Sequence, residues 1–281
     1  MNIVSTIQEL RKEIRSFKQG NLTIGFVPTM GYLHEGHLKL LEEARKENDI
    51  VVLSIFVNPL QFGPNEDFDS YPRNAERDQK LAEQAGVDLI FTPPVTEMYP
   101  DEPAYTVIVK KRIDVLCGRS RKGHFDGVAT VLTKLFNMVQ PDKAYFGMKD
   151  AQQVAVIDGL ISEFNFPIHL VAVPTIREED GLAKSSRNVN LNDRERIEAT
   201  ALYKSLCEAK ELILKGERSK QKVIELVTSI ISTNTSGKID YVEILNYPKL
   251  EEIEVLHGNI IIAVAVKFTN ARLIDNITIE V

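Results

Sequence analysis

The first part of the chain alternates between short, continuously apolar runs and longer segments whose apolar residues recur at helical spacing. A continuous apolar, β-branched run predicts a strand covered on both faces, and apolar residues three and four apart predict an amphipathic helix. The predicted strands cover residues 22–27, 50–57, 89–91, 143–146 and 168–173, with Pro28 expected to end the first. The predicted helices cover residues 5–18, 36–47, 73–85, 127–139 and 150–163.

Strands that alternate with helices predict a parallel, doubly wound α/β sheet, with ligands bound where the strands end. The pattern changes after about residue 176, where helical segments at 193–214 and 219–232 precede strands at 238–246, 259–268 and 272–279. Helices followed by a run of strands are typical of a separate α+β unit. We therefore expect a Rossmann-like domain over residues 1–176 and a smaller C-terminal α+β domain over residues 177–281.

The composition is that of an ordinary globular protein, with 43% hydrophobic and 26% charged residues among 281. The formal net charge of −6 argues against general nucleic-acid binding. The chain has no apolar run of about 18 residues, and its N-terminus lacks the pattern of a signal peptide. Cys117 and Cys207 lie far apart without metal-ligand spacing, as expected of reduced thiols. We expect a cytoplasmic protein that binds no membrane and has no metal site built from its own side chains.

His34 and His37 stand at the start of a predicted helix, directly after the first predicted strand. A helix N-terminus carries unpaired N–H groups and partial positive charge, so it attracts phosphate. Imidazoles at positions i and i+3 lie on the same helix face, and Gly36 allows a ligand to approach the backbone closely. An isolated H-x-G-H sequence is more often a helix start with two solvated histidines, but its place behind a buried strand favours a nucleotide site.

Five segments, in order and over nearly the whole chain, resemble the pantothenate synthetase (pantoate–β-alanine ligase) family. They are residues 28–37 (PTMGYLHEGH), 56–63 (FVNPLQFG), 145–153 (YFGMKDAQQ), 180–188 (DGLAKSSRN) and 270–276 (NARLIDN). The resemblance implies a Rossmann-like sheet of the nucleotidyltransferase type. It also implies a ligase that joins (R)-pantoate to β-alanine at the expense of ATP. The reaction would pass through pantoyl adenylate and release AMP and pyrophosphate.

The resemblance also implies site residues. The residues assigned to ATP are Met30, Gly31, Tyr32, Leu33, His34, Glu35, Gly36, His37, Gly147, Met148, Lys149, Asp150, Ile176, Lys184, Ser185, Ser186 and Arg187. Pantoate is assigned to Gln61 and Gln153, and β-alanine to Gln61. Both glutamines are neutral amides, which can bind hydroxyls and carboxylates without adding a charge that competes with the nucleophile. His34, His37 and Lys149 are the expected catalytic residues.

The chemistry of these residue types agrees with that assignment. Histidine and lysine donors at strand-to-helix turns can neutralise the charge on phosphates, which is most of what phosphoryl chemistry requires. The role of His37 is either electrostatic or, as the resemblance suggests, that of a proton donor. Asp150 is a candidate for ribose hydroxyls or for the shell of Mg²⁺. We expect Mg²⁺ as a cofactor, with mostly phosphate oxygens and water as its ligands.

Residues 178–192 form a polar, charged segment between the two predicted domains. The hydroxyls of Ser185 and Ser186 and the fork of Arg187 suit a pyrophosphate leaving group. The family pattern often has methionine where this chain has Lys184, which either places a cation beside the triphosphate or is simply solvated. With few apolar anchors, the segment is expected to be mobile when empty, and residues 177–281 to act as a lid over bound ATP.

Alternatives to this hypothesis remain. The basic run at residues 118–124 has two glycines but lacks the Lys and Ser/Thr of a P-loop, so it either closes over a substrate or is solvated. A nucleotidyltransferase would use the same H-x-G-H and stop at a nucleotide product. A non-catalytic nucleotide sensor would not need His37, Lys149 and Ser186 together. Resemblance, rather than any pattern in the residues, suggests a homodimer formed through the N-terminal domain.

Overall fold

The computed structural model describes residues 1–63 and 68–281, and its internal contacts group them into two compact units. Unit 1 comprises Met1–Ile113, Gly118–Gly147 and Val156–Val173. Unit 2 comprises Asp114–Cys117, Met148–Ala155 and Pro174–Val281. None of the helices in these described stretches has the length and apolar content needed to span a bilayer. The assignment of residues 1–176 and 177–281 to two domains, the second a lid, stays a prediction.

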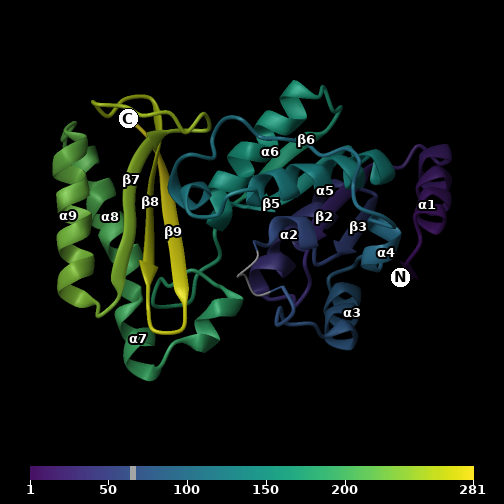
Figure 1. The fold of residues 1–281 in the computed structure, drawn as a ribbon, viewed down its shortest axis with the longest axis horizontal. Coiled ribbons are helices and arrows are strands. Elements are labelled where there is room, and N and C mark those ends of the chain that lie inside the picture. The colour runs from purple at the N-terminus through teal and green to yellow at the C-terminus, as the bar shows by residue number, and fades with distance from the viewer. Residues whose placement is uncertain (64–67) are drawn as a thin grey trace. The chain divides into compact units, whose positions relative to one another are not determined.

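Unit 1 contains a six-stranded sheet in which every strand pair is parallel. Its strands are β1 (Asn2–Val4), β2 (Ile24–Thr29), β3 (Ile50–Ile55), β4 (Leu89–Phe91), β5 (Lys143–Gly147) and β6 (His169–Val173). The strand order is β1-β4-β3-β2-β5-β6. From β2 the chain adds strands on one side, β3 and then β4, and from β5 it adds β6 on the other side, so the switch point lies between β2 and β5, both labelled in Figure 1. In doubly wound sheets this switch point is where ligands bind, beyond the carboxyl ends of the strands. The predicted doubly wound α/β fold is therefore confirmed.

Helices cover both faces of this sheet. The helices up to β6 are α1 (Ile7–Gln19), α2 (Glu35–Glu47), α3 (Ala75–Gln84), α4 (Val95–Met98), α5 (His124–Val139) and α6 (Ala151–Glu163). The same part of the chain has the 3₁₀ turns η1 (Pro59–Gln61), η2 (Leu116–Arg119) and η3 (Met148–Asp150). On one face, Val27 of β2 shares a core with Leu41 of α2 and Ala82 of α3. Phe26, the preceding residue of β2, meets Phe136 of α5 edge-on at 6.4 Å. This alternation of side chains buries both faces of the strand.

The prediction that Pro28 ends the first strand was wrong, because β2 continues through Pro28 to Thr29. Beyond Phe26, β2 is paired only with β3, where Pro28 stands opposite Ser54. A proline that lacks its N–H is tolerated where a strand has a neighbour on one side alone. The extension carries β2 directly to the turn before the two histidines.

Other differences concern short or interrupted elements. The strand β1 and the four-residue helix α4 were not predicted, since three or four residues carry too little periodicity to be recognised. The predicted helix 193–214 is two helices, α7 (Asp193–Glu198) and α8 (Thr200–Leu214). They separate at Ala199, and the Thr200 hydroxyl donates to the carbonyl of Ile197 at 2.8 Å, which caps the end of α7.

Unit 2 is built on an antiparallel sheet of β7 (Lys238–Asn246), β8 (Asn259–Lys267) and β9 (Arg272–Glu280), in that order. Alternate residues of β8 and β9, such as Val264 and Leu273, pack against α8 and α9 (Lys220–Asn234), which lie along the sheet in Figure 1. Apart from Phe268, the buried residues of this core are aliphatic, as expected for one face of a half-buried sheet. The predicted smaller α+β arrangement is thus present.

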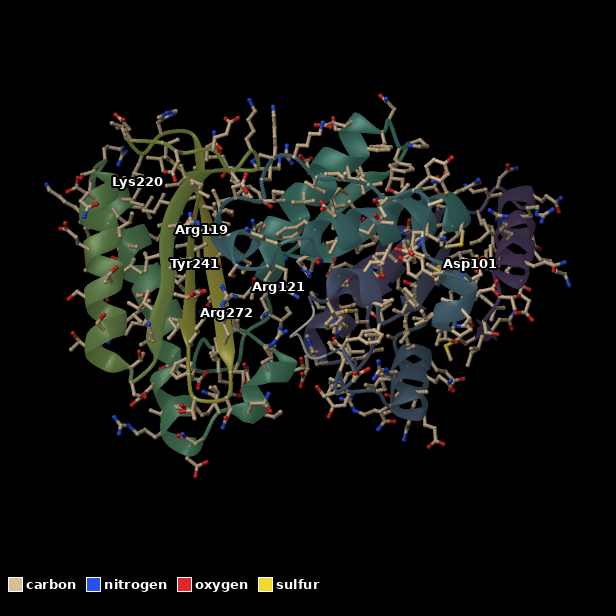
Figure 2. All side chains as sticks on the ribbon, in the orientation of Figure 1. Asp101, Arg119, Arg121, Lys220, Tyr241 and Arg272 are labelled. Carbon is tan, nitrogen blue, oxygen red and sulfur yellow. The ribbon has the colours of Figure 1, made fainter. Side chains whose placement is uncertain are left out.

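The opposite face of the same sheet holds two segments from earlier in the chain. Ala151 and Leu116 pack against Ile261 and Ala263 of β8. Arg272, at the start of β9, donates to the Cys117 sulfur at 3.3 Å and places its guanidinium 5.6 Å from the Tyr241 ring centre; Figure 2 labels Arg272 and Tyr241 on the sheet. These contacts explain why residues 114–117 and 148–155 group with unit 2.

Candidate functional site

His34 and His37 cap the start of α2 reciprocally. His34 is the N-cap residue, and its Nδ1 accepts from the backbone N–H of Gly36 at 3.1 Å. The Nδ1 of His37 accepts from the backbone N–H of His34 at 3.3 Å. The two rings lie 4.1 Å apart between centroids and are tilted by 35°. This is a capping box in which both acceptors are imidazoles rather than the usual hydroxyl and carboxylate.

These caps determine which ring nitrogen carries a proton. Because both Nδ1 atoms accept hydrogen bonds, a neutral His34 or His37 holds its proton on Nε2. Each ring therefore has an Nε2–H donor at the end of a 13-residue helix, where the helix dipole also attracts anions. A Cβ on Gly36 would lie 2.8 Å from Cε1 of His34, so a glycine here leaves room for the imidazole.

The turn between β2 and α2 is held by a buried carboxylate that was not predicted. Gly31 and Tyr32 have φ values of +86° and +50°, in the left-handed region. Asp78 of α3, only 2% exposed, accepts from the N–H groups of Tyr32 at 2.7 Å and Leu33 at 2.8 Å. A Cβ at Gly31 would also lie 2.9 Å from Ile55, which explains the glycine. By accepting these two hydrogen bonds, the Asp78 carboxylate stabilises the left-handed backbone conformation of the turn.

The residues of this turn contribute in different ways. The Leu33 side chain is fully buried in the core beside α2, so only its backbone remains for a ligand. The Arg77 guanidinium lies 5.2 Å from the Tyr32 ring centre and also donates to the carbonyl of Leu33 at 2.7 Å. Glu35 is exposed in the first turn of α2. Backbone and histidines, more than apolar side chains, define this part of the site.

Gln61 lies in a buried polar cluster beside the turn. Its side-chain oxygen accepts from Asn58 Nδ2 at 3.2 Å, and its side-chain nitrogen donates to the Met30 sulfur at 3.0 Å. Asn58, 1% exposed, accepts in turn from the Tyr99 hydroxyl at 3.0 Å. Burial raises the pKa of the Tyr99 phenol above its ordinary value, so it remains a donor at neutral pH. Unit 1 therefore brings Met30, the histidine turn and Gln61 together.

The start of α5 fixes the backbone of Gln61. Nδ1 of His124 lies 2.8 Å from the Gln61 carbonyl oxygen and therefore donates to it. Nε2 of His124 lies 3.0 Å from Nη1 of Arg121, which is labelled in Figure 2. At Gly127, a Cβ would come within 2.3 Å of the Leu60 carbonyl oxygen, so the helix and η1 are in close backbone contact. The role of the run at residues 118–124 in closing over a substrate stays a prediction.

In unit 2, Met148, Lys149 and Asp150 form the 3₁₀ turn η3 before α6. Their backbone is held by Asn276, whose side-chain amide donates to the carbonyls of Met148 at 2.9 Å and Lys149 at 3.0 Å. Lys149 is half-buried, and no acidic residue in the described part of the chain pairs with its ammonium group. Asp150 is exposed. A half-buried cation without a carboxylate partner is suited to bind an anion.

Two further site residues flank this turn. A Cβ on Gly147, the last residue of β5, would have no atom of the described chain within 4 Å. Gln152 is buried and donates to the carbonyl of Val115 at 2.8 Å. Gln153, next to it on α6, is half-buried, and its amide forms no hydrogen bond with residues 1–63 or 68–281. Of the two adjacent glutamines, the one predicted to bind pantoate is the one whose amide is not hydrogen-bonded within the described residues.

The segment after residue 176 is an ordered hairpin for part of its length. Lys184 donates its backbone N–H to the carbonyl of Ile176 at 2.9 Å, and Arg177 and Ala183 form an isolated antiparallel β-bridge. Leu182, 3% exposed, belongs to the core beneath α8. The expectation of few apolar anchors across residues 178–192 was therefore wrong for its first half. We now expect motion to be confined to residues beyond the hairpin.

The predicted phosphate-binding residues follow that hairpin. Ser185 caps the 3₁₀ turn η4 (Ser186–Asn190) by accepting from the N–H of Arg187 at 3.2 Å. Arg187 is exposed, and within the described residues its guanidinium has no carboxylate partner. Ser186 is half-buried at the first position of η4. The use of the Ser185 hydroxyl as a cap leaves Ser186 and Arg187 as the better candidates for pyrophosphate.

The structure also tests which residues could bind a metal ion. Across residues 1–63 and 68–281, no three His, Cys, Asp or Glu side chains are grouped so as to hold one.

The doubly wound sheet and the histidine-capped helix define an α/β protein of the nucleotide-binding class. The chain also matches the family model described as Pantoate-beta-alanine ligase over residues 2–278. It belongs to this family and is a ligase that forms an amide bond.

Related proteins support this membership over the full chain. The pantothenate synthetase of Geobacillus sp. (strain WCH70) is 62% identical over 281 residues, covering 100% of both chains. That of Bacillus subtilis (strain 168) is 59% identical over 100% of this chain and 98% of its own. A crystal structure of the pantothenate synthetase of Thermus thermophilus superimposes with a TM-score of 0.92 at 45% identity, covering 99% of each chain.

A further solved relative contains ligands. The pantoate-β-alanine ligase of Francisella tularensis, described as complexed with beta-gamma ATP and β-alanine, has a TM-score of 0.78. It is 34% identical, covering 99% of this chain and 97% of its own.

The first prediction concerns the Nε2–H of His37. His37→Asn keeps an oxygen where Nδ1 accepts from His34 but removes the outer donor. We expect the variant to fold normally and adenylation to slow by roughly 10²–10³-fold, the scale for losing one preorganised donor. His37→Gln restores a donor without proton transfer, so recovery of activity identifies an electrostatic role. Exchanging the exposed His257 for Asn serves as control. Normal adenylation in His37→Asn would exclude His37 from the chemistry.

The second prediction concerns Asp78. Asp78→Asn replaces one acceptor oxygen by a donor that faces a backbone N–H. We expect the free energy of unfolding to fall by about 1–3 kcal/mol and the KM for ATP to rise, because the turn at Gly31 and Tyr32 loses its anchor. Asp49→Asn is a matched control: Asp49 also accepts two hydrogen bonds, from the Thr23 N–H and hydroxyl, but is exposed. Urea unfolding and steady-state kinetics distinguish the two. Equal effects of both variants on KM would contradict the assignment.

Proposed function

We propose that this chain condenses (R)-pantoate with β-alanine in two displacements at the expense of ATP. The observation that carries the proposal is the pair of Nε2–H donors at the start of α2, oriented by reciprocal Nδ1 caps. Donors fixed before the reaction stabilise developing charge without reorganisation. Membership of the ligase family and the ATP and β-alanine complex of a relative agree with this use.

In the first step, a carboxylate oxygen of pantoate attacks the α-phosphorus of ATP. The bond from that phosphorus to the bridging oxygen breaks, and pyrophosphate leaves with the electron pair. His34 and His37 donate hydrogen bonds to the phosphate oxygens, and Lys149 neutralises part of their charge. Ser186 and Arg187 bind the departing pyrophosphate. No protein group becomes covalently attached.

In the second step, the neutral amine of β-alanine attacks the acyl carbon of pantoyl adenylate. The carbon–oxygen bond to AMP breaks, the nitrogen loses a proton, and pantothenate forms. A carboxylate alone is a poor acyl donor, and AMP is a far better leaving group than oxide. Gln61 binds both pantoate and β-alanine, and Gln153 binds pantoate, through neutral amides. Neither glutamine presents a negative charge to repel the two carboxylate substrates.

Mg²⁺ is part of the proposal because several phosphate charges must be neutralised together. When bound, it would supply that charge to the triphosphate. The exposed carboxylate of Asp150 is the residue we assign to it or to the ribose. A single carboxylate fits Mg²⁺, which commonly keeps several waters and binds through one or two carboxylates and the substrate's phosphates. We also propose a cytoplasmic location, because the chain's relatives belong to a biosynthetic ligase family.

A homodimer formed through unit 1 is a further part of the proposal. Tyr105 is 92% exposed and Ile108 68% exposed in a stretch without helix or strand. The backbone N–H groups of Val107 and Val109 donate to Thr130 and Asp126 of α5, which holds the stretch against the helix. Large apolar side chains on a fixed surface segment are typical of an interaction site.

The dimer is tested with Tyr105→Ser combined with Ile108→Asp. Placing a charge in an apolar interface should convert the dimer to a monomer, as measured by analytical ultracentrifugation. Val255→Asp, at another exposed apolar position, is the control and should leave the association unchanged. A dimer that persists in the double variant would exclude this surface.

The adenylate route is tested by isotope exchange. With pantoate and without β-alanine, the enzyme should exchange labelled pyrophosphate into ATP, because the first step is reversible and complete in itself. Ser186→Ala with Arg187→Ala should slow this exchange yet spare the reaction of supplied pantoyl adenylate with β-alanine. Full turnover without pantoate-dependent exchange would point to a concerted reaction. Release of pyrophosphate with accumulation of a stable nucleotide product, and without release of AMP, would instead favour a nucleotidyltransferase.

A further inference from the structure

Two adjacent residues of β9, Asp275 and Asn276, contact the two segments of unit 2 that we propose bind phosphate. Asn276 binds the backbone of η3, and Asp275 binds Arg177 in the hairpin that precedes Ser185. Successive side chains of a strand point to opposite faces of its sheet. Leu273 packs on the face that carries α8, which is also the face of Asp275. Asn276 lies on the other face, and its amide donates to Met148 and Lys149. One dipeptide thus reaches η3 on one face and the hairpin at residues 176–184 on the other.

The Asp275 contact is a bidentate ion pair. Its two oxygens accept from Nη1 and Nη2 of Arg177 at 2.6 and 2.9 Å, and Asp275 is 3% exposed. The Arg177 guanidinium lies 3.6 Å from the Tyr203 ring centre and also donates to the Gly181 carbonyl at 3.0 Å. The planar fork and the aromatic stack fix the guanidinium in position and orientation. The hairpin that leads to Ser185 is therefore anchored at its first residue.

The Asn276 contact uses both amide hydrogens. Nδ2 donates to the carbonyls of two successive residues of η3, and the backbone N–H of Asn276 donates to the Asp275 carboxylate at 2.8 Å. Asn276 is 8% exposed, and a buried amide costs free energy unless its donors are satisfied. An apolar residue would fill the same space on a sheet face whose buried neighbours are leucine, alanine and isoleucine. The amide is therefore explained by what it holds rather than by packing.

We propose that Asp275 and Asn276 are positioning residues for adenylation, which together set the placement of Lys149 and of the segment 184–187 for the phosphates of ATP. The proposal rests on the proposed function only in the identity of that ligand. Lys149 carries its cation on a turn whose two carbonyls are tied to Asn276. A shift of about 1 Å in such a group can cost roughly 10²-fold in rate. Asp275 and Asn276 therefore limit how far η3 and the segment 184–187 can move relative to β9.

The experiment compares Asn276→Ala, Asn276→Ser and Asn48→Ala. Asn48 is a matched control, because it is also 8% exposed and its Nδ2 also donates twice, to the Ala44 carbonyl and the Tyr145 hydroxyl. We expect Asn276→Ala to weaken binding of Mg²⁺-ATP about 10-fold by calorimetry, within the range for a lost buried hydrogen bond. Asn276→Ser keeps one donor and should fall between Ala and the native residue. Asn48→Ala should lower the melting temperature and leave ATP affinity unchanged.

Kinetics separate positioning from general damage. In Asn276→Ala the KM for ATP should rise, while the KM for pantoate should stay within about twofold, since Asn276 is hydrogen-bonded to Met148 and Lys149 rather than to Gln61 or Gln153. If Asn276→Ala and Asn48→Ala lose thermal stability alike and neither changes ATP affinity, the amide is merely structural and the proposal is overturned. A native enzyme that binds ATP but shows no pyrophosphate exchange would refute the proposed adenylation and leave the binding comparison intact.

The second contact gives an independent test if Asn276→Ala does not fold. Arg177→Lys keeps the charge but loses the fork and the stack on Tyr203, so hydrogen exchange across residues 182–188 should accelerate and ATP affinity should fall. Combining it with Asn276→Ser should give an effect that is not the product of the two, because both contacts act on one ligand. Independent, multiplicative effects, or unchanged ATP affinity in Arg177→Lys, would contradict a joint role.

Discussion

The geometry of the turn between β2 and α2, which leads to the two histidines, depends on the buried carboxylate of Asp78. Two consecutive left-handed residues, Gly31 and Tyr32, turn the chain sharply from β2 toward α2. A buried backbone N–H group in such a turn must find an acceptor, because leaving it unpaired costs free energy. Asp78 supplies both oxygens, and this positions His34 as the N-cap. The reciprocal imidazole caps, and with them the two Nε2–H donors, follow from that placement.

The same device occurs twice more, with asparagine in place of aspartate. Asn58 binds the Gln61 side chain and the Gly127 carbonyl, and Asn276 binds the carbonyls of η3. In each case a buried polar side chain satisfies the backbone or amide of an irregular segment. This arrangement lets loops carry the chemistry while their own hydrogen bonds remain internal. Lys149 and Arg187 hold no such segment in place, and neither has an acidic partner within the described chain.

The elements themselves were largely predictable, because long apolar runs and helical spacing report burial directly. The strand boundary at Pro28 and the break at Ala199 were not, since both depend on which neighbours a residue pairs with. In the site, the histidines follow from sequence because the motif is local. Asp78 carries a weaker signal: it is a charged residue four positions before the buried Ala82, on the apolar side of its helix. Asn276 lies in the segment 270–276 that resembles the family, but nothing in the sequence shows what it binds, because only the fold brings it to Met148, 128 residues earlier.

The resemblance to a family assigns residues that contact a ligand. The residues that hold those ligand-binding residues in place have to be found from their contacts in the structure. The distinction matters for Gln152 and Gln153, which are adjacent and chemically identical. Gln152 is buried and bonded to Val115, whereas the Gln153 amide has no such bond in the described chain. Burial with satisfied hydrogen bonds indicates support, and partial burial with an unused amide indicates a ligand contact. Applied to Ser185 and Ser186, the same criterion identifies Ser185 as the cap of η4 and leaves Ser186 as the candidate for the proposed pyrophosphate contact.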